Sequence, residues 1–371
     1  MKNWGNRPWK VEFRAEPREL SAKVEYAVVG GGFSGLAAAA WLKKLAPEKS
    51  VALLEAEEFG AGASGHTGGM ALSETAAGDL PGLGDVLAGY KKILRELEVD
   101  GDLTLPGAYE LGRRDALADS PLRWKDSGDL CAVKRVEGGT INPGKVVGGL
   151  ARAAARNGAL LYENAGVETA KFGEEVRLET KRGSLCAKKV LFATNAYSLE
   201  MTGLQERAEP TFTLAAMTHE LSEAVFEEIG LGERKPFYTV DLPYLWGRPL
   251  EMAMIFGCGL VHVKNWRELE ELDIERGEAP EMFARLEKRV NGLHPALEGV
   301  KFTHRWGGPI CISDEVKPVF EQHPESAKAI VLGAFSGHGV AQSVYLGAWA
   351  AEAILGRREL PEWRSAKAPK E

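Results

Sequence analysis

The chain has 371 residues, 44% of them hydrophobic, and its 46 Lys and Arg against 53 Asp and Glu give a net charge of −7. This length allows two domains with substantial cores, and the acidic balance argues against nucleic acid as a principal partner. No apolar run approaches the ~20 residues of a membrane span, and the polar N-terminus lacks a signal-peptide core. Four scattered cysteines without CxxC spacing predict reduced thiols and no metal site, so we expect a cytoplasmic protein.

A glycine motif at residues 24–35 is the strongest local signal. A short apolar run predicts a buried parallel strand, and an Ala- and Leu-rich stretch at 36–45 predicts a helix. Between them Gly30, Gly32 and Gly35 have the spacing G-x-G-x-x-G. These glycines allow a tight turn, close approach of the backbone to a pyrophosphate, and close packing of helix on strand. The helix N-terminus offers N–H groups to the phosphates.

A second strand is predicted at 51–56, where Glu55 follows Gly35 by twenty residues. A carboxylate at this place typically binds the adenosine ribose hydroxyls. The glycine-rich stretch 57–70 follows directly, which favours a loop lying against a cofactor over a flexible linker. Together these signals predict a dinucleotide-binding α/β domain, and a merely structural glycine turn is the less favoured interpretation.

Helix signals recur in two later segments. Asp85 is the expected N-cap of an amphipathic helix at 85–98. Asn142 as N-cap and Gly158 after the last turn predict a helix within 141–158, with a proline at its first position.

The remaining segments read mainly as strands. Strands are expected at 159–167 and 188–198, the latter ending in a small-residue turn near the pyrophosphate. Turn-rich, strand-like stretches fill 99–139 and 206–305, where a packing helix is predicted at 281–295. The aromatics Tyr238, Tyr244 and Trp246 either wall a substrate pocket or form an ordinary sheet face.

A second glycine turn lies near the C-terminal end. A strand at 329–335 runs into Ser336-Gly337-His338-Gly339, and a helix begins near Val340. This helix N-terminus would direct its positive dipole end toward a second ligand group, and a reduced flavin is an anion that needs such a partner.

The order of these motifs resembles the D-amino-acid oxidase, glycine oxidase and sarcosine oxidase family. Within it the chain is most similar to the γ-glutamylputrescine-oxidase-like amine oxidoreductases. The resemblance extends from about Tyr26 to Leu355 and is weakest at 206–300. It implies FAD, a two-domain fold, and oxidation of the C–N bond of an amine or amino acid. In such enzymes a hydride passes to flavin N5 and the imine is then hydrolysed.

The resemblance also implies a division of the chain into an arm and two domains. A polar N-terminal arm (1–22), expected to lie over the surface, precedes a discontinuous Rossmann-type FAD-binding domain (23–75, 140–205 and 306–371). A β-sheet-based substrate domain is inserted as 76–139 and 206–305.

The expected catalytic residues are His338 beside the flavin, and Arg248 and Arg305 as candidates for gripping a substrate carboxylate. A structural histidine and solvated arginines are the alternatives. The cofactor-binding residues expected are Gly30, Gly32, Phe33, Ser34, Gly35, Glu55, Ala56, Ala63, Ser64, Gly65, His66, Thr67, Gly68, Gly69, Met70, Val167, Ala193, Thr194, Asn195, Ser336, Gly337, His338, Gly339 and Val340.

His66 is also a candidate for a covalent bond to the flavin. Dimethylglycine and sarcosine dehydrogenases resemble this loop and carry there a histidine bonded to the flavin 8α-methyl group. The alternative is a histidine that only stacks on the flavin or lies at the surface, and Cys311 is a weaker candidate for attachment.

Three other functions stay open. A flavin monooxygenase or halogenase that uses NAD(P)H shares the first glycine motif. A flavoprotein subunit of a hetero-oligomeric dehydrogenase, or an oxidoreductase acting on a modified RNA base, would also bind FAD. The sequence does not identify the substrate, or whether O2 or another acceptor reoxidises the flavin.

Overall fold

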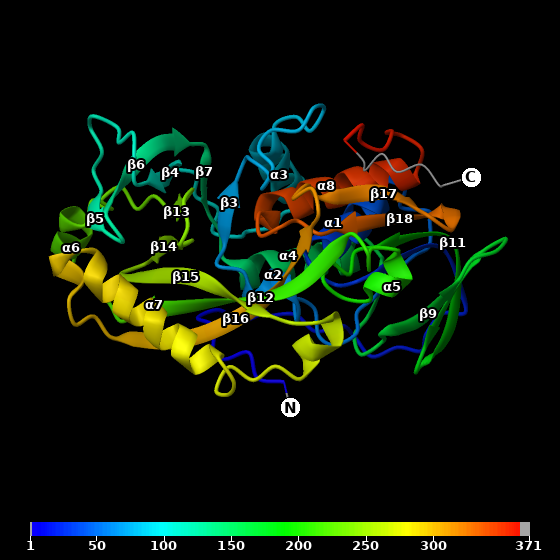
Figure 1. The fold of residues 1–371 in the computed structure, drawn as a ribbon. Coiled ribbons are helices and arrows are strands. Elements are labelled where there is room, and N and C mark those ends of the chain that lie inside the picture. The colour runs from blue at the N-terminus through cyan, green and yellow to red at the C-terminus, as the bar shows by residue number, and fades with distance from the viewer. Residues whose placement is uncertain (1, 364–371) are drawn as a thin grey trace.

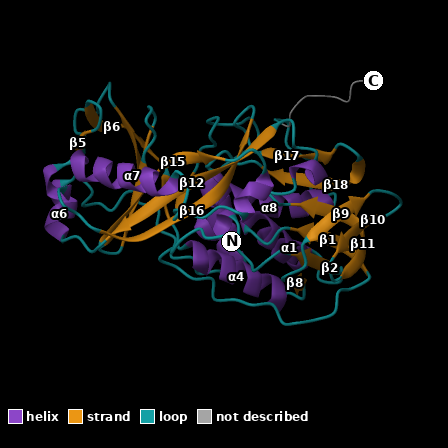
Figure 2. Cartoon of the chain, turned by 60° about the horizontal axis from the view of Figure 1, so that its bottom comes forward, coloured by secondary structure: helices purple, strands orange, loops and turns teal. Residues whose placement is uncertain are grey.

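The computed structural model describes residues 2–363, and within this range two large sheets lie side by side (Figure 1). Several long helices lie against the sheet that contains the first glycine motif, and one long helix lies against the other sheet (Figure 2). The predicted α/β class, with a Rossmann-type half and a β-sheet half, is confirmed. In this part of the chain no helix has the length and apolar character needed to cross a bilayer.

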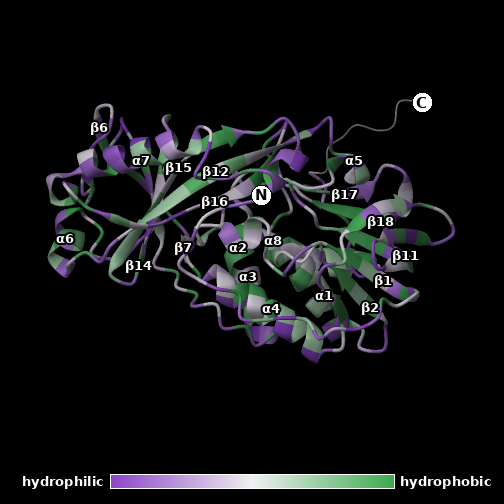
Figure 3. Ribbon diagram, turned by 90° about the horizontal axis from the view of Figure 1, so that it is seen from below, coloured by the Kyte–Doolittle hydropathy of each residue, from purple (hydrophilic) through white to green (hydrophobic). Residues whose placement is uncertain are grey.

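The first sheet has the order β17-β18-β11-β1-β2-β8, and its strands from β18 to β8 run parallel. Val28 and Leu53 at its centre are fully buried, and Figure 3 shows these central strands as hydrophobic. Parallel strands covered on both faces need such continuous apolar runs. The strands are β1 (Lys23–Val29), β2 (Val51–Leu54), β8 (Leu160–Tyr162), β11 (Gly183–Phe192), β17 (Val319–His323) and β18 (Ser326–Gly333), and β10 (Val176–Thr180) joins β9 (Val167–Lys171) to β11.

The helices around this sheet follow the predicted capping signals. Asp85 accepts a hydrogen bond from the Ala88 N–H at 2.8 Å, and Asn142 accepts one from Lys145 at 3.2 Å. Gly158 has the positive φ of +89° expected after a helix end. The helices are α1 (Phe33–Leu45), α2 (Ala63–His66), α3 (Val86–Glu96), α4 (Pro143–Arg156), α5 (Leu199–Thr202) and α8 (Gly339–Ile354).

The second sheet has the order β16-β12-β15-β14-β13-β4-β6-β5. Its strands are β4 (Ala108–Gly112), β5 (Arg123–Lys125), β6 (Asp129–Val136), β12 (Ala208–Thr218), β13 (Phe237–Thr239), β14 (Trp246–Leu250), β15 (Ala253–His262) and β16 (Phe302–Ser313). Helix α7 (Ala279–Leu293) packs on it through Phe283, Leu286 and Val290, as predicted. A ribbon of β3 (Met70–Leu72) and β7 (Gly138–Thr140), helix α6 (Glu223–Glu228) and the 3-10 turns η1 (Trp266–Glu270) and η2 (Pro295–Leu297) complete the fold.

The third predicted FAD-domain segment, 306–371, begins inside a strand of the second sheet. β16 pairs with β12 from Phe302 to Ser313, so its residues after 306 are still hydrogen-bonded to that sheet. Residues 364–371 of the predicted segment lie outside the described residues. The division into domains stays a prediction, but strand pairing favours a boundary after Ser313.

The N-terminal arm is more deeply packed than a surface strap. Trp4 and Trp9 are only 3% and 5% exposed. The Asn3 side chain donates to Asp273, and Gly5 forms a β-bridge with Trp306, so the arm extends the edge of the second sheet. The arm therefore contributes to the core between the two sheets.

A substitution at Gly35 tests the close packing of α1 on β1. A Cβ added at Gly35 would lie 1.9 Å from the Gly30 carbonyl oxygen. We expect Gly35→Ala to lower the free energy of unfolding of the apoprotein by about 1–3 kcal/mol, the usual cost of overpacking. Denaturant unfolding measures it.

The matched control is Gly292→Ala in α7, where an added Cβ meets nothing within 4 Å. Because alanine is the better helix former, this change should be neutral or stabilise by up to ~1 kcal/mol. Equal effects of the two substitutions would contradict the packing argument.

Candidate active site

A cavity of about 2030 Å³ is lined by residues of both sheets. At its nucleotide end lie the β1–α1 turn, the end of β2 and residues 164–170 and 193–201. At its other end lie strands of the second sheet, the loop 242–244 and α7. Typical small-molecule pockets measure ~300–1,000 Å³, so this cavity has room for a dinucleotide and a second molecule.

The β1–α1 turn leaves the helix N-terminus open on the cavity side. Gly30 has φ +105°, which side chains rarely adopt, and Gly32 as N-cap brings no capping side chain. The Phe33 N–H donates to Ser64 Oγ at 2.8 Å, which ties α2 to the start of α1. Backbone N–H groups at an open helix N-terminus suit a pyrophosphate.

Glu55 lies beside this turn at the end of β2. Its carboxylate accepts hydrogen bonds from the Gly31 N–H at 2.6 Å and the Glu57 N–H at 2.9 Å. Burial raises the pKa of the Glu55 carboxyl, although these hydrogen bonds act in the opposite direction. A half-buried carboxylate fixed next to the glycine turn fits the predicted contact with ribose hydroxyls.

The second glycine turn is held by the ends of three strands. Asn195, after β11, accepts the Ala334 N–H at 3.0 Å, and the Ser336 N–H donates to the Cys311 carbonyl of β16 at 2.9 Å. Gly337 has φ +84° and nothing within 4 Å of an added Cβ. The N-terminus of α8 is therefore rigidly placed and carries no side-chain cap.

His338 is the N-cap residue of α8 and lines the cavity. Burial lowers the pKa of its imidazole, and Nδ1 lies 3.3 Å from the Ser336 carbonyl oxygen. Its ring also meets the edge of Tyr238, with centroids 6.4 Å apart. Burial of the His338 imidazole thus disfavours its charged form.

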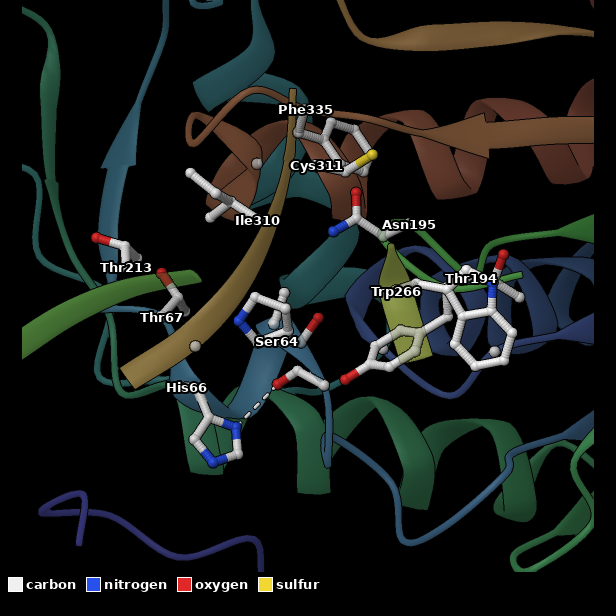
Figure 4. A pocket seen from close by; sticks show the side chains of 18 of the residues that line it. Ser64, His66, Thr67, Thr194, Asn195, Thr213, Trp266, Ile310, Cys311 and Phe335 are labelled. Atoms are coloured by element: carbon white, nitrogen blue, oxygen red, sulfur yellow. Dashed lines mark hydrogen bonds between the residues drawn. The ribbon is translucent and has the colours of Figure 1, made fainter. Parts of the chain in front are cut away.

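His66 is held by the N-terminal arm. Its Nδ1 lies 2.9 Å from the Gly62 carbonyl oxygen, and Nε2 lies 2.9 Å from Arg7 Nη1. The two contacts match a neutral ring that donates from Nδ1 and accepts at Nε2. Figure 4 shows the imidazole pointing away from Thr67 and Ile310. Both ring nitrogens are already in contact with protein groups, so the predicted covalent bond to flavin would require one of these contacts to break.

Most of the predicted cofactor residues do line the cavity, but Gly35, Gly65 and Gly69 do not. Gly35 and Gly65 instead allow close backbone packing, because an added Cβ would lie 1.9 Å and 2.1 Å from the carbonyl oxygens of Gly30 and Gly60. The predicted residues that line the cavity are Gly30, Gly32, Phe33, Ser34, Glu55, Ala56, Ala63, Ser64, His66, Thr67, Gly68, Met70, Val167, Ala193, Thr194, Asn195, Ser336, Gly337, His338, Gly339 and Val340.

Neither predicted arginine lines the cavity. Arg305 pairs with Glu287 of α7 at 2.5 Å. Arg248 is 3% exposed, lies 5.7 Å from the Trp9 ring, and has no hydrogen-bond partner for Nε or Nη2. Burial lowers the pKa of Arg248 to about 10. The structure therefore does not bring these residues together with His338.

Several residues that line the cavity were not predicted from the sequence, including Trp306, Thr213 and Ile310. Of the three aromatics considered, Tyr244 and Trp246 line the cavity, whereas buried Tyr238 donates its hydroxyl to Glu110 at 2.8 Å. The alternation of side chains along a strand is the sequence signal that could have indicated them. It does not show which strands are neighbours, and so it does not show which face lines a cavity.

Comparison with known proteins agrees with this geometry. The model of the FAD dependent oxidoreductase (DAO) family matches residues 25–353. The chain belongs to this family. Gamma-glutamylputrescine oxidoreductase of Escherichia coli is 26% identical over 91% of this chain and 85% of its own, and the probable oxidoreductase OrdL of Rhizobium meliloti is 26% identical over 91% and 84%.

Solved structures share the fold. Glycine oxidase from Geobacillus kaustophilus superposes with a TM-score of 0.73 at 18% identity, covering 91% of this chain and 96% of its own. L-proline dehydrogenase from P. horikoshii gives 0.74 at 19%, covering 92% and 96%. The predicted family, FAD dependence and oxidoreductase class are confirmed.

The residues present fit FAD. Two helix N-termini without side-chain caps, of α1 and α8, reach one cavity, and Glu55 lines the same cavity while bonded to the turn before α1. The cavity volume exceeds the need of a small ligand alone.

The lowered pKa of His66 predicts how the free energy of unfolding depends on pH. Burial, then the positive charge of Arg7, lower the pKa of His66 from 6.5 to about 3. Between these values the unfolded chain binds a proton that the folded chain does not, so stability falls as pH drops from 6.5 toward 3, by about 1.4 kcal/mol per unit. We expect His66→Asn to reduce the slope of unfolding free energy against pH by about 1.4 kcal/mol per pH unit, which corresponds to one proton. Urea unfolding series of the apoprotein at several pH values measure it.

The control is His219→Asn, because His219 is exposed. Its unfolding series should keep the parent slope. A parent slope in the His66 variant would show that His66 is protonated in the folded protein.

Proposed function

We propose that this FAD-dependent oxidoreductase oxidises the C–N bond of an amine or amino acid. The observation that supports it most directly is a single cavity that joins a dinucleotide-type end to an aromatic-walled end. Bound FAD supplies the two-electron acceptor for this oxidation. The substrate loses a hydride equivalent and a proton, its C–N bond becomes C=N, and water then converts the imine to a carbonyl compound and an amine.

The chain's own groups would act by positioning and electrostatics. The N–H groups of Gly337, Gly339 and Val340 can each stabilise negative charge on the reduced cofactor by about 1–2 kcal/mol. Trp246 and Trp306 line the cavity and would exclude water from the reacting carbon.

The electron acceptor and the compartment belong to the same proposal. O2 or another acceptor would reoxidise the flavin. The four cysteines, all described and none in a disulfide, support a reducing compartment and so the cytoplasm.

A first experiment tests cofactor binding. A Cβ at Gly32 would lie 2.8 Å from Ser64 Oγ, at the open N-terminus of α1. We expect Gly32→Val to fold but to purify colourless, because the side chain occupies the pyrophosphate position. Flavin absorbance per chain and circular dichroism are the measurements.

The control is Gly173→Val, since Gly173 lies outside the cavity and its nearest contact would be at 3.7 Å. It should stay yellow. A fully loaded Gly32→Val protein would contradict the assignment of this turn.

A second experiment tests the reductant. An anaerobic stopped-flow screen of primary and secondary amines and amino acids should find compounds that bleach the flavin faster than NADPH by at least about a hundredfold, because positioned substrates react far faster than unpositioned ones. Fast reduction by NADPH alone would favour a monooxygenase, and a stable partner chain would favour a hetero-oligomeric subunit.

A further inference from the structure

The charges along the cavity wall are paired within the protein. Among the described residues, five lysines and arginines line the cavity, and each has a carboxylate partner. The three at the nucleotide end pair with glutamates: Lys2 with Glu57, Lys181 with Glu168 and Arg267 with Glu200.

The two at the second-sheet end are arginines of α7. Arg285 pairs with Glu281 at 2.5 Å, and both side chains are exposed. Arg289 donates from Nε and Nη2 to Asp126 at 3.0 Å and 2.6 Å. Its remaining bonds go to the carbonyl oxygens of Pro243 and Tyr244 at 2.7 Å and 2.8 Å. Arg289 is therefore occupied in holding the loop at the cavity mouth.

The two arginines expected to grip a carboxylate are also outside this wall. Arg305 pairs with Glu287, and Arg248 lies under Trp9. The two histidines nearest the glycine turns, His66 and His338, have pKa values lowered by burial. No lysine or arginine that lines the cavity thus offers an unpaired charge to an anion at the second-sheet end. The guanidinium of Arg248 in β14 is unpaired, but it is buried against Trp9 and does not line the cavity.

Most of the large side chains at this end are apolar. Met70, Leu72, Trp246, Ile310 and Met282 line it, beside the polar residues Thr213 and His262 and the paired arginines of α7. Large apolar side chains continue to the mouth and stay exposed there, with Leu242 at 84%, Tyr244 at 41% and Leu260 at 41%. Exposed apolar side chains grouped at a cavity mouth favour an apolar ligand.

We infer that the substrate is an amine with an apolar substituent and no α-carboxylate, an inference that rests on the proposed C–N oxidation. The α-carboxylate of an amino acid is bonded to the carbon that is oxidised, so it would be buried with that carbon. A buried carboxylate without a cationic partner is strongly disfavoured. The neutral amine of the same shape carries no such penalty.

Matched pairs of compounds test this directly. Phenethylamine and phenylalanine differ by the α-carboxylate alone, as do isopentylamine and leucine, and both enantiomers of each amino acid are used. We expect each amine to reduce the flavin of the anaerobic holoenzyme at least about a hundredfold more efficiently than its amino acid.

A binding measurement needs no turnover. Neutral 2-phenylethanol should perturb the flavin absorption spectrum at lower concentration than phenylacetate, its anionic counterpart. Tighter phenylacetate binding, or amino acids that reduce the flavin as fast as their amines, would overturn this inference and leave C–N oxidation standing. If neither class reduces the flavin, the proposed function itself fails.

The mouth residues provide a variant pair on one loop. Leu242 lines the cavity, whereas Val240, 55% exposed and two residues away, does not. We expect Leu242→Asp to raise the amine concentration for half-maximal reduction about fivefold, because part of the leucine's apolar contact with the substrate is lost. Val240→Asp should leave it unchanged. Equal effects of the two variants would show that Leu242 does not contact the substrate.

Discussion

Two indole N–H groups fix α2 between the sheets. Trp9 donates to the Gly65 carbonyl at 2.8 Å, and Trp306 donates to the His66 carbonyl at 3.0 Å. One tryptophan comes from the arm and the other from β16, while α2 itself is tied to α1 through Ser64. Since an unpaired buried carbonyl is costly, α2 cannot leave this position without losing both bonds. The spacing between the nucleotide end of the cavity and the second sheet is therefore set by hydrogen bonds rather than by a flexible linker.

The N-termini of α1 and α8 offer backbone N–H groups, because neither helix is capped by a side chain of its N-cap residue. Gly337 and the turn around it are held by Asn195 and the Cys311 carbonyl, so N–H groups point in a fixed direction before any ligand arrives. Such preorganised dipoles stabilise charge that develops during a reaction without needing to reorganise. Side-chain charges near the cavity are neutralised by partners, as Arg289 is by Asp126. The arrangement matches chemistry in which negative charge appears on the cofactor and the substrate enters uncharged.

The parts of the fold that sequence could predict are those governed by local chemistry. The spacing of Gly30 and Gly35, and the N-caps Asp85 and Asn142, act within a few residues of themselves, so their effect is visible in the chain. Pairing partners are not local. The residues of the arm do not indicate that Gly5 forms a β-bridge with Trp306, which is about three hundred residues away in the chain. The same limit explains the boundary at 306, because β16 is assigned to a sheet only by its pairing with β12.

Arg305 and Trp306 illustrate how this limit affects a site. Successive residues of a strand face opposite sides of the sheet. Once β16 is paired with β12, Trp306 faces the cavity, and Arg305 must face α7, where Glu287 neutralises it. Arg305 became a candidate for carboxylate binding through its residue type alone. Its strand has no clear alternation of apolar and polar residues, so the sequence does not show on which face of the sheet it lies. The pairing of strands that are distant in sequence fixes the face on which Arg305 lies. That face determines whether its charge can bind a ligand or instead pairs with another residue of the protein.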